Sequence, residues 1–276
     1  MTTNIFNTDG LHPHIAAMVA TDALFSKLPT RLLSVSTDAK TVKGETDDIL
    51  TGIIYLSPAD TVSTKYTLCP YADIAGCKDG CLNTAGRGRF SNVQRARIRK
   101  ALFWQQYRAD FMALLVTDIK RLIIKAARLG MTPAVRLNGT SDICWENIPV
   151  GPLAITQFGN PAYETATVFD LFPNVQFYDY TKIPGRTTPD NYHLTFSYSG
   201  REIFRHAVVK QLKHSEHANI AVVFADRLPS EFLGRPVING DASDVRFNDD
   251  AGVIVGLLAK GDAKTDHSGF VCRMGA

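Results

Sequence analysis

The sequence predicts an α/β protein whose parallel strands close fully or partly into a β/α barrel. Short apolar, β-branched runs recur along the chain, and the spacers between them are long enough to hold helices. Alternation of this kind is typical of units in which a helix connects two parallel strands. The length of 276 residues suits one such barrel, because α/β barrels of about 250 residues form single domains.

The N-terminal part of the chain shows little periodic pattern. Residues 34–45 are rich in Ser, Thr, Asp, Lys and Gly, a composition typical of exposed loops. The first strand is expected at residues 52–56, where an apolar run ends at a Ser-Pro pair. We therefore expect residues 1–50 to be an irregular lead-in, and residues 51–276 to form a single barrel-like domain.

Helical spacing begins after a glycine-rich segment. Over residues 92–129 apolar side chains recur at intervals of three and four residues, and Gly130 follows as a stop signal. This span is long for one helix, so a break within it is expected. A later helix pair is predicted at residues 164–171 and 201–213, and further strands at residues 134–137, 175–178, 192–197, 220–224, 236–238 and 253–258.

The overall composition is that of a globular protein. Hydrophobic residues make up 45% and charged residues 21%, which excludes a disordered chain, a coiled coil and a collagen-like fibre. No apolar run approaches the roughly 18 residues that a bilayer span needs. The N-terminal segment also lacks the basic start and apolar stretch of a secretory signal, so we expect no membrane or export role.

Small polar residues follow several of the predicted strands. In parallel α/β folds, functional side chains lie on the loops at the carboxyl ends of the strands. We expect these segments to meet on one face of the sheet, together with a cysteine-rich loop; the alternative is that they only form turns. The segments are residues 138–142, 179–182, 197–199 and 239–244.

Three of the five cysteines lie close together in the sequence. Cys69, Cys77 and Cys81 have the spacing C-x7-C-x3-C within a glycine-rich segment. Three thiolates on one loop can ligate three irons of a [4Fe-4S] cluster and leave the fourth iron for another ligand. A structural zinc ion is the alternative, and it needs a fourth ligand such as Cys144, Cys272 or a histidine. Thiols without a ligand are the third interpretation, and a reducing cytoplasm is the expected compartment.

Three motifs resemble the phage-encoded "gene product 88" family. They are CKDGCLNTAGRG at residues 77–88, RLNGTSD at residues 136–142 and FYDYTK at residues 177–182. The likeness runs from about residue 52 to the C-terminus. It implies a phage origin, a cysteine triad that binds a cluster, and the cytoplasm of the infected host cell as the location.

The position of the cysteines after the first strand also resembles the radical S-adenosylmethionine (SAM) enzymes. The usual spacing in those enzymes is C-x3-C-x2-C, from which this chain departs. The resemblance implies that Asn138, Gly139, Thr140 and Ser141 contact the methionine amino group of SAM. The alternative for this segment is a helix N-cap and a turn.

Asp142, Asp179 and Lys182 are candidates for acid–base or charge-recognition roles, because they follow predicted strands. A solvent-exposed salt bridge would explain the last two equally well. No nucleophile elbow and no Walker-type glycine loop is present, so hydrolase and ATPase functions lack support.

A basic run without acidic residues extends over residues 87–100. Arg95, Arg97, Arg99 and Lys100 are candidates for contact with nucleic-acid phosphates. The alternative is that they form the solvated face of an amphipathic helix.

Three functions are open from the sequence. The first is a phage iron–sulfur enzyme of radical-SAM type that acts on an unknown small-molecule or macromolecular substrate. The second is a non-enzymatic iron–sulfur protein that binds nucleic acid or a host protein. The third is a zinc-stabilised structural protein.

Overall fold

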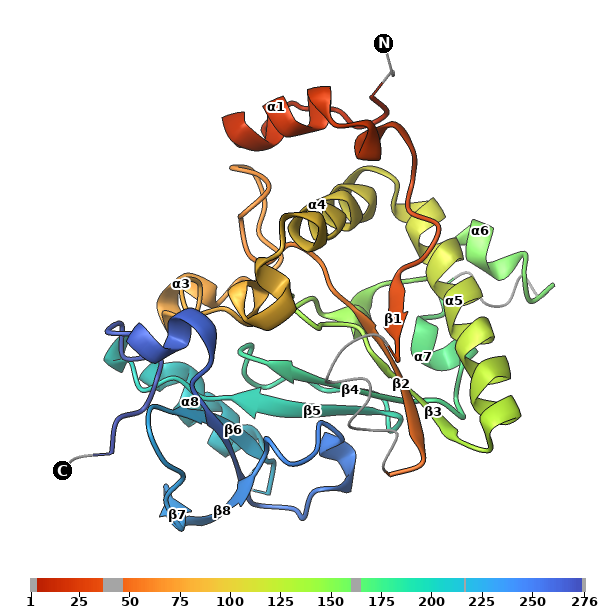
Figure 1. Ribbon diagram of the computed structural model, residues 1–276. Coiled ribbons are helices and arrows are strands. Elements are labelled where there is room, and N and C mark those ends of the chain that lie inside the picture. The colour runs from red at the N-terminus through yellow and green to blue at the C-terminus, as the bar shows by residue number, and fades with distance from the viewer. Residues whose placement is uncertain (1–3, 37–46, 160–164, 216, 275–276) are drawn as a thin grey trace. The chain divides into compact units, whose positions relative to one another are not determined.

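The computed structural model describes residues 4–36, 47–159, 165–215 and 217–274. The chain divides into a first unit, residues 1–69 and 90–177, and a second unit, residues 70–89 and 178–276. Among the described residues there are nine strands and seven α-helices, and most strand pairs are parallel. The fold is therefore mixed α/β, as the sequence predicts (Figure 1).

The first unit is built on two central parallel strands. β2 (Ile49–Ile54) pairs with β3 (Thr132–Arg136), and β3 pairs with the start of β4 (Gln176–Thr181). β1 (Leu33–Val35) adds an antiparallel edge. All six residues of β2 are buried, as expected for a strand that is covered on both faces.

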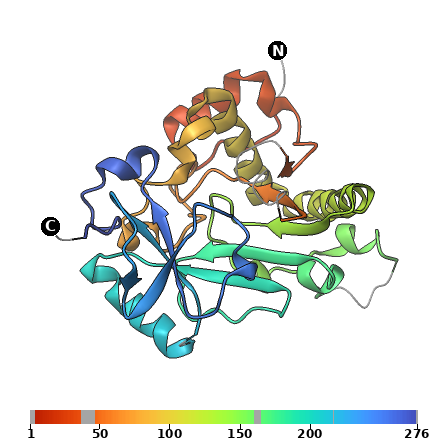
Figure 2. The same ribbon diagram turned by 60° about the horizontal axis from the view of Figure 1, so that its bottom comes forward.

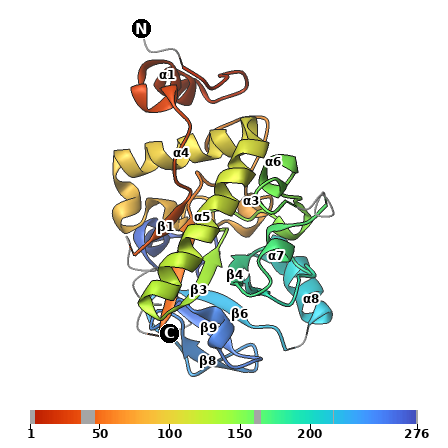
Figure 3. The same cartoon turned by 90° about the vertical axis from the view of Figure 1, so that its right-hand side faces the viewer.

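The long helical span consists of two helices. α4 (Ser91–Gln106) and α5 (Arg108–Leu129) are separated at Tyr107, whose φ of −132° and ψ of 54° are not helical. The expected break is therefore present. α5 packs along β1, β2 and β3 through its apolar face, and Figure 3 shows it beside these strands. No helix in the described part of the chain combines the length and apolarity needed to cross a bilayer.

The N-terminal region is more regular than the sequence indicates. α1 (Pro13–Thr21) starts with a proline in its first turn, where the missing N–H costs nothing, and it buries Ile15 and Val19. Two short helices, α6 (Pro152–Ile155) and α7 (Val168–Leu171), complete the first unit. The helix predicted at residues 164–171 is thus shorter, and its first residue lies outside the described residues.

The second unit has the strand order β4-β5-β6-β9-β8-β7. β5, β6, β9 and β8 pair in parallel, and β7 closes the series with an antiparallel pair. These strands span Tyr192–Ser197 (β5), Ile220–Phe224 (β6), Glu231–Phe232 (β7), Arg235–Asn239 (β8) and Ile254–Leu258 (β9).

One face of the second unit's strands is covered by α8 (Arg205–His214). Ala207 and Val208 of this helix pack against Ile220, Val222 and Phe224. These three residues alternate along β6, so their side chains share one face. Figure 2 shows α8, in cyan, along one side of these strands. A further short helix, α3 (Ala72–Ala75), lies in the cysteine loop.

The predicted barrel is not present among the described residues. The strand series is open, since β1 and β7 each end it with one antiparallel neighbour. Closing a barrel needs strands that tilt and pair all round, and an antiparallel edge strand stops that series. The hydrophobic pattern identifies strands but does not specify which strand lies at an edge.

Candidate functional site

The cysteine loop joins the two units. Cys69 ends the first segment of the first unit, whereas Cys77 and Cys81 belong to the second unit. All five cysteines of the chain are half-buried.

Cys69 closes a loop that follows β2. The backbone N–H of Ala59 donates to its Sγ at 3.3 Å, and Ala59 has a φ of +47°, in the left-handed region. A non-glycine residue in that region costs of the order of 1 kcal/mol and persists only where the surrounding structure holds it. The loop is also fixed by the amide of Leu68, which donates to the carbonyl of Ala59 at 2.8 Å.

Cys69 adjoins the segment after β3. Its Sγ is 4.0 Å from the carbonyl oxygen of Thr140, and the amide of Asp142 donates to the carbonyl of Leu68 at 2.8 Å. Two segments about seventy residues apart in the chain therefore meet at the carboxyl ends of neighbouring parallel strands.

Cys77 and Cys81 lie in the second unit between two short helical segments, α3 and a 3₁₀ helix over Leu82–Thr84. Cys77 follows α3 directly after Gly76, whose φ of +69° favours glycine. The Sγ of Cys77 lies 3.8 Å from the carbonyl oxygen of Ala72. Cys81 caps a short 3₁₀ helix, because its Sγ accepts the N–H of Asn83 at 3.4 Å.

The donor chemistry of the loop suits a soft metal centre, since thiolates are the usual ligands of iron–sulfur clusters and N–H groups that donate to sulfur tune them. Cys69 and Cys81 each accept one such N–H. However, the described residues contain no group of three His, Cys, Asp or Glu side chains arranged to hold a metal ion. The ligand set Cys69, Cys77 and Cys81 therefore stays a prediction.

The two remaining cysteines, Cys144 and Cys272, lie outside this loop. Cys272 forms an isolated bridge with Phe224 at the C-terminal end of β6 and packs against the apolar cluster under α8. Burial raises the pKa of Cys272 to about 11, although the charge of Lys182 opposes this shift. Such a thiol is protonated at neutral pH. Cys144 precedes the buried ring of Trp145.

The segment after β3 is an internally bonded turn. The side-chain Oδ1 of Asn138 accepts from Ser141 Oγ at 2.8 Å, from the amide of Ile143 at 3.0 Å and from Trp145 Nε1 at 3.1 Å. The hydroxyl of Thr140 donates to the carbonyl of Leu56 at 2.6 Å. These hydrogen bonds agree with the turn interpretation, and contact of Asn138, Gly139, Thr140 and Ser141 with SAM stays a prediction.

Gly139 is required in this turn by close packing. A Cβ at this position would lie 2.6 Å from the carbonyl oxygen of Ile54 and 2.7 Å from a side-chain carbon of Ile53. The amide of Gly139 also donates to that same Ile54 carbonyl at 3.0 Å. The glycine therefore allows the turn to sit against β2.

Asp179 and Lys182 are buried, so the exposed salt bridge is the wrong interpretation for both. Asp179 lies within β4, with none of its surface exposed, and accepts the hydroxyl of Tyr192 at 3.1 Å. Lys182 is 8% exposed, and its Nζ donates to the carbonyl of Ser197 at 3.1 Å and the hydroxyl of Ser197 at 3.0 Å. The loops after β4 and β5 therefore meet within the second unit.

The basic run is also not a solvated helix face. Arg95 forms an ion pair with Asp22 at 2.8 Å, Arg99 donates to a backbone carbonyl at 3.0 Å, and Lys100 donates to the carbonyl of Leu32 at 2.7 Å. Arg97 is 9% exposed, with its guanidinium 5.0 Å from the ring centre of Tyr55. These contacts hold α4 in the first unit, and binding of nucleic acid by this run remains a prediction.

A buried charge cluster in the second unit was not anticipated from the sequence. Arg246 is 1% exposed and forms an ion pair with Asp249 at 3.2 Å. Burial raises the pKa of Asp249, and the charge of Arg246 opposes that effect. Burial, assisted by Arg246, lowers the pKa of His193. An arginine in a polar loop gives no sequence signal of such burial.

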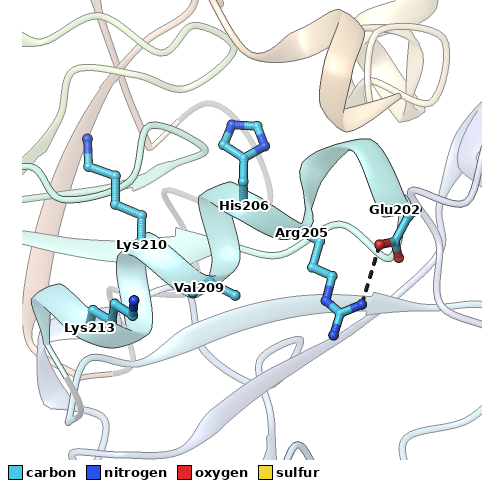
Figure 4. Close-up of a pocket in the computed structure, with 6 residues that line it drawn as sticks. All are labelled: Glu202, Arg205, His206, Val209, Lys210 and Lys213. Atoms are coloured by element: carbon cyan, nitrogen blue, oxygen red, sulfur yellow. Dashed lines mark hydrogen bonds and ion pairs between the residues drawn. The ribbon is translucent and has the colours of Figure 1, made fainter.

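A pocket of about 670 Å³ lies on the outer side of α8 (Figure 4). None of the predicted site residues lines it. Its lining consists of Glu202, Arg205, His206, Val209, Lys210 and Lys213.

Comparison with known proteins identifies one family. The family model described as Gene product 88 matches residues 30–274. Neither the curated proteins nor the solved structures gave a match. The resemblance to radical SAM enzymes thus has no support from these comparisons. Because the match covers most of the sequence, the chain belongs to the Gene product 88 family.

Proposed function

We propose that this phage-family protein binds an iron–sulfur cluster through Cys69, Cys77 and Cys81. The observation that supports the proposal is the concentration of sulfur in one loop, where Cys69, Cys77 and Cys81 are half-buried and the sulfur atoms of Cys69 and Cys81 accept backbone N–H groups. Backbone donors to sulfur stabilise the thiolate form that a cluster requires.

A bound cluster would supply one-electron transfer and, with three cysteine ligands, an iron able to take an exchangeable ligand. The protein residues around the loop have separate tasks. Ala59 and Asn83 donate N–H groups to sulfur, and Gly76 allows the turn that leads into Cys77. Lys182 supplies a buried positive charge in the second unit, where Cys77 and Cys81 also lie.

The test compares cysteine variants of protein purified without oxygen. Replacing Cys69, Cys77 or Cys81 by Ala should abolish the broad visible absorption of a cluster and release its iron. Cys272→Ala is the matched control and should keep both, because this protonated thiol packs into the apolar core. Retention of iron by all three loop variants would exclude the proposed ligand set.

The radical-SAM form of the proposal depends on SAM as a further cofactor, with Asp142, Asp179 and Lys182 as candidates around a substrate. Addition of SAM to the reduced cluster should then change its electron paramagnetic resonance signal and yield 5′-deoxyadenosine. An unchanged signal would indicate that the cluster carries electrons or has a structural role and does not bind SAM. Stoichiometric zinc without sulfide would favour the zinc-stabilised alternative.

A further inference from the structure

The outer face of α8 carries a concentrated positive charge. The helix buries Ala207, Val208 and Gln211 against its unit and exposes its remaining polar residues. Three of these carry fixed positive charge, and no acidic residue occurs from Arg205 to His214. The exposed positions are Arg205, His206, Val209, Lys210, Lys213 and His214.

These side chains form two parallel ridges. Arg205, Val209 and Lys213 follow each other at intervals of four residues, and His206 and Lys210 form the neighbouring ridge. Figure 4 shows His206 and Lys210 pointing to one side of the helix and Arg205 to the other. The pocket of about 670 Å³ lies among them.

The charges of this face are available to a partner. The ion pair of Arg205 with Glu202, at 3.4 Å, joins side chains that are 73% and 84% exposed, so it contributes little. Lys210 and Lys213 are exposed at the helix surface. By contrast, the cations of α4 donate to acceptors of their own unit.

We propose that the outer face of α8 binds the sugar–phosphate backbone of nucleic acid. From Arg205 to Lys213 the helix rises by ~12 Å, and a strand of duplex presents about three or four phosphates over that length. Val209 is the single apolar side chain in the pocket lining. A protein interface or a membrane-surface helix needs a larger apolar area than this.

The test measures binding of the full chain to short duplex DNA, single-stranded DNA and duplex RNA over a range of salt concentrations. Three phosphate contacts on duplex DNA predict a slope of log K against log salt of roughly −3. The double variant Lys210→Gln, Lys213→Gln should reduce the magnitude of that slope by about 2. The variant Lys210→Arg, Lys213→Arg should preserve it.

The matched control is Lys27→Gln, Lys264→Gln, which removes two charges from exposed lysines outside α8. It should leave the slope unchanged. Equal loss in this control would show an effect of net charge alone and would overturn the proposal. Absence of salt-dependent binding, or binding of polyglutamate as tight as that of DNA, would overturn it as well. The preference among the three nucleic acids identifies the natural form.

Discussion

At the residue scale, several charged side chains are buried or half-buried. Lys100, Lys182 and Arg246 each lie against backbone carbonyl groups of their own unit. Burial of a charge is unfavourable unless hydrogen bonds replace the lost water. These side chains therefore fix the loops and strands to which they are bound.

Lys100 gives a pH-dependent prediction. Burial lowers its pKa from 10.5 to about 8, with the carboxylate of Asp118 opposing the shift. Between these two pH values unfolding lets Lys100 take up a proton, so the contribution of this lysine to the free energy of unfolding rises with pH. The free energy of unfolding of the wild type minus that of Lys100→Met should therefore increase by about 3 kcal/mol between pH 7 and pH 11.

Denaturant unfolding followed by tryptophan fluorescence measures this difference. Both tryptophans, Trp104 and Trp145, lie in the first unit with Lys100. The exposed Lys27→Met variant is the control and should follow the wild-type pH profile. Parallel profiles for wild type and Lys100→Met would contradict the assigned burial.

Gly139 gives a steric prediction. In Gly139→Ala the new methyl group meets the carbonyl of Ile54 and the side chain of Ile53, which belong to a buried strand and have little room to move. The loss of stability should be roughly 1–3 kcal/mol. Gly80→Ala, whose nearest neighbour would be 3.4 Å away, should cost much less. Thermal unfolding checks both variants, and equal midpoints would disprove the close packing.

At the element scale, the edge strand β1 is held by side chains of two helices. Asp118 of α5 accepts the amide of Leu32 at 2.6 Å and that of Leu33 at 3.3 Å. Lys100 of α4 binds the carbonyl of Leu32. Edge strands expose unpaired backbone groups. Here charged side chains form hydrogen bonds with the backbone groups at the start of the strand.

Asp118→Ala should remove the hydrogen bonds to the amides of Leu32 and Leu33 and so loosen β1. Hydrogen bonds to a charged group contribute roughly 1.5–3 kcal/mol, so amide exchange at Leu33–Val35 should accelerate about ten- to a hundredfold. The amides of β3 should keep their protection. Asp110→Ala, which removes an exposed carboxylate from the same helix, is the control. Uniform acceleration of β1 and β3 would indicate global destabilisation instead.

The elements with strong periodicity were predictable from the sequence. β5 and β6 match the expected ranges, because each is a short run of strand-forming residues with clear ends. α1 was missed, since its apolar pattern is weak and its stability comes from packing of Ile15 and Val19. The strand β4 also extends through Asp179, because tertiary burial there overrides the polar character of the residue.

At the scale of the whole molecule, the sequence predicted the α/β class and the family, but the predicted barrel is absent because the strand series is open. The order of strands depends on long-range pairing, which local patterns do not encode. For the candidate site, the cysteine spacing identified the loop. The side chain of Asn138 forms its hydrogen bonds within its own turn, whereas the hydroxyl of Thr140 donates to Leu56 in a distant segment, a contact that no local motif reveals.

The central claim is that the loop of Cys69, Cys77 and Cys81 binds an iron–sulfur cluster. The most direct measurement is the content of iron, acid-labile sulfide and zinc per chain in protein purified without oxygen. The account predicts iron and sulfide in similar amounts, about four of each for a [4Fe-4S] cluster, and no stoichiometric zinc. Zinc without sulfide, or no metal in protein that is folded and stable, would contradict it.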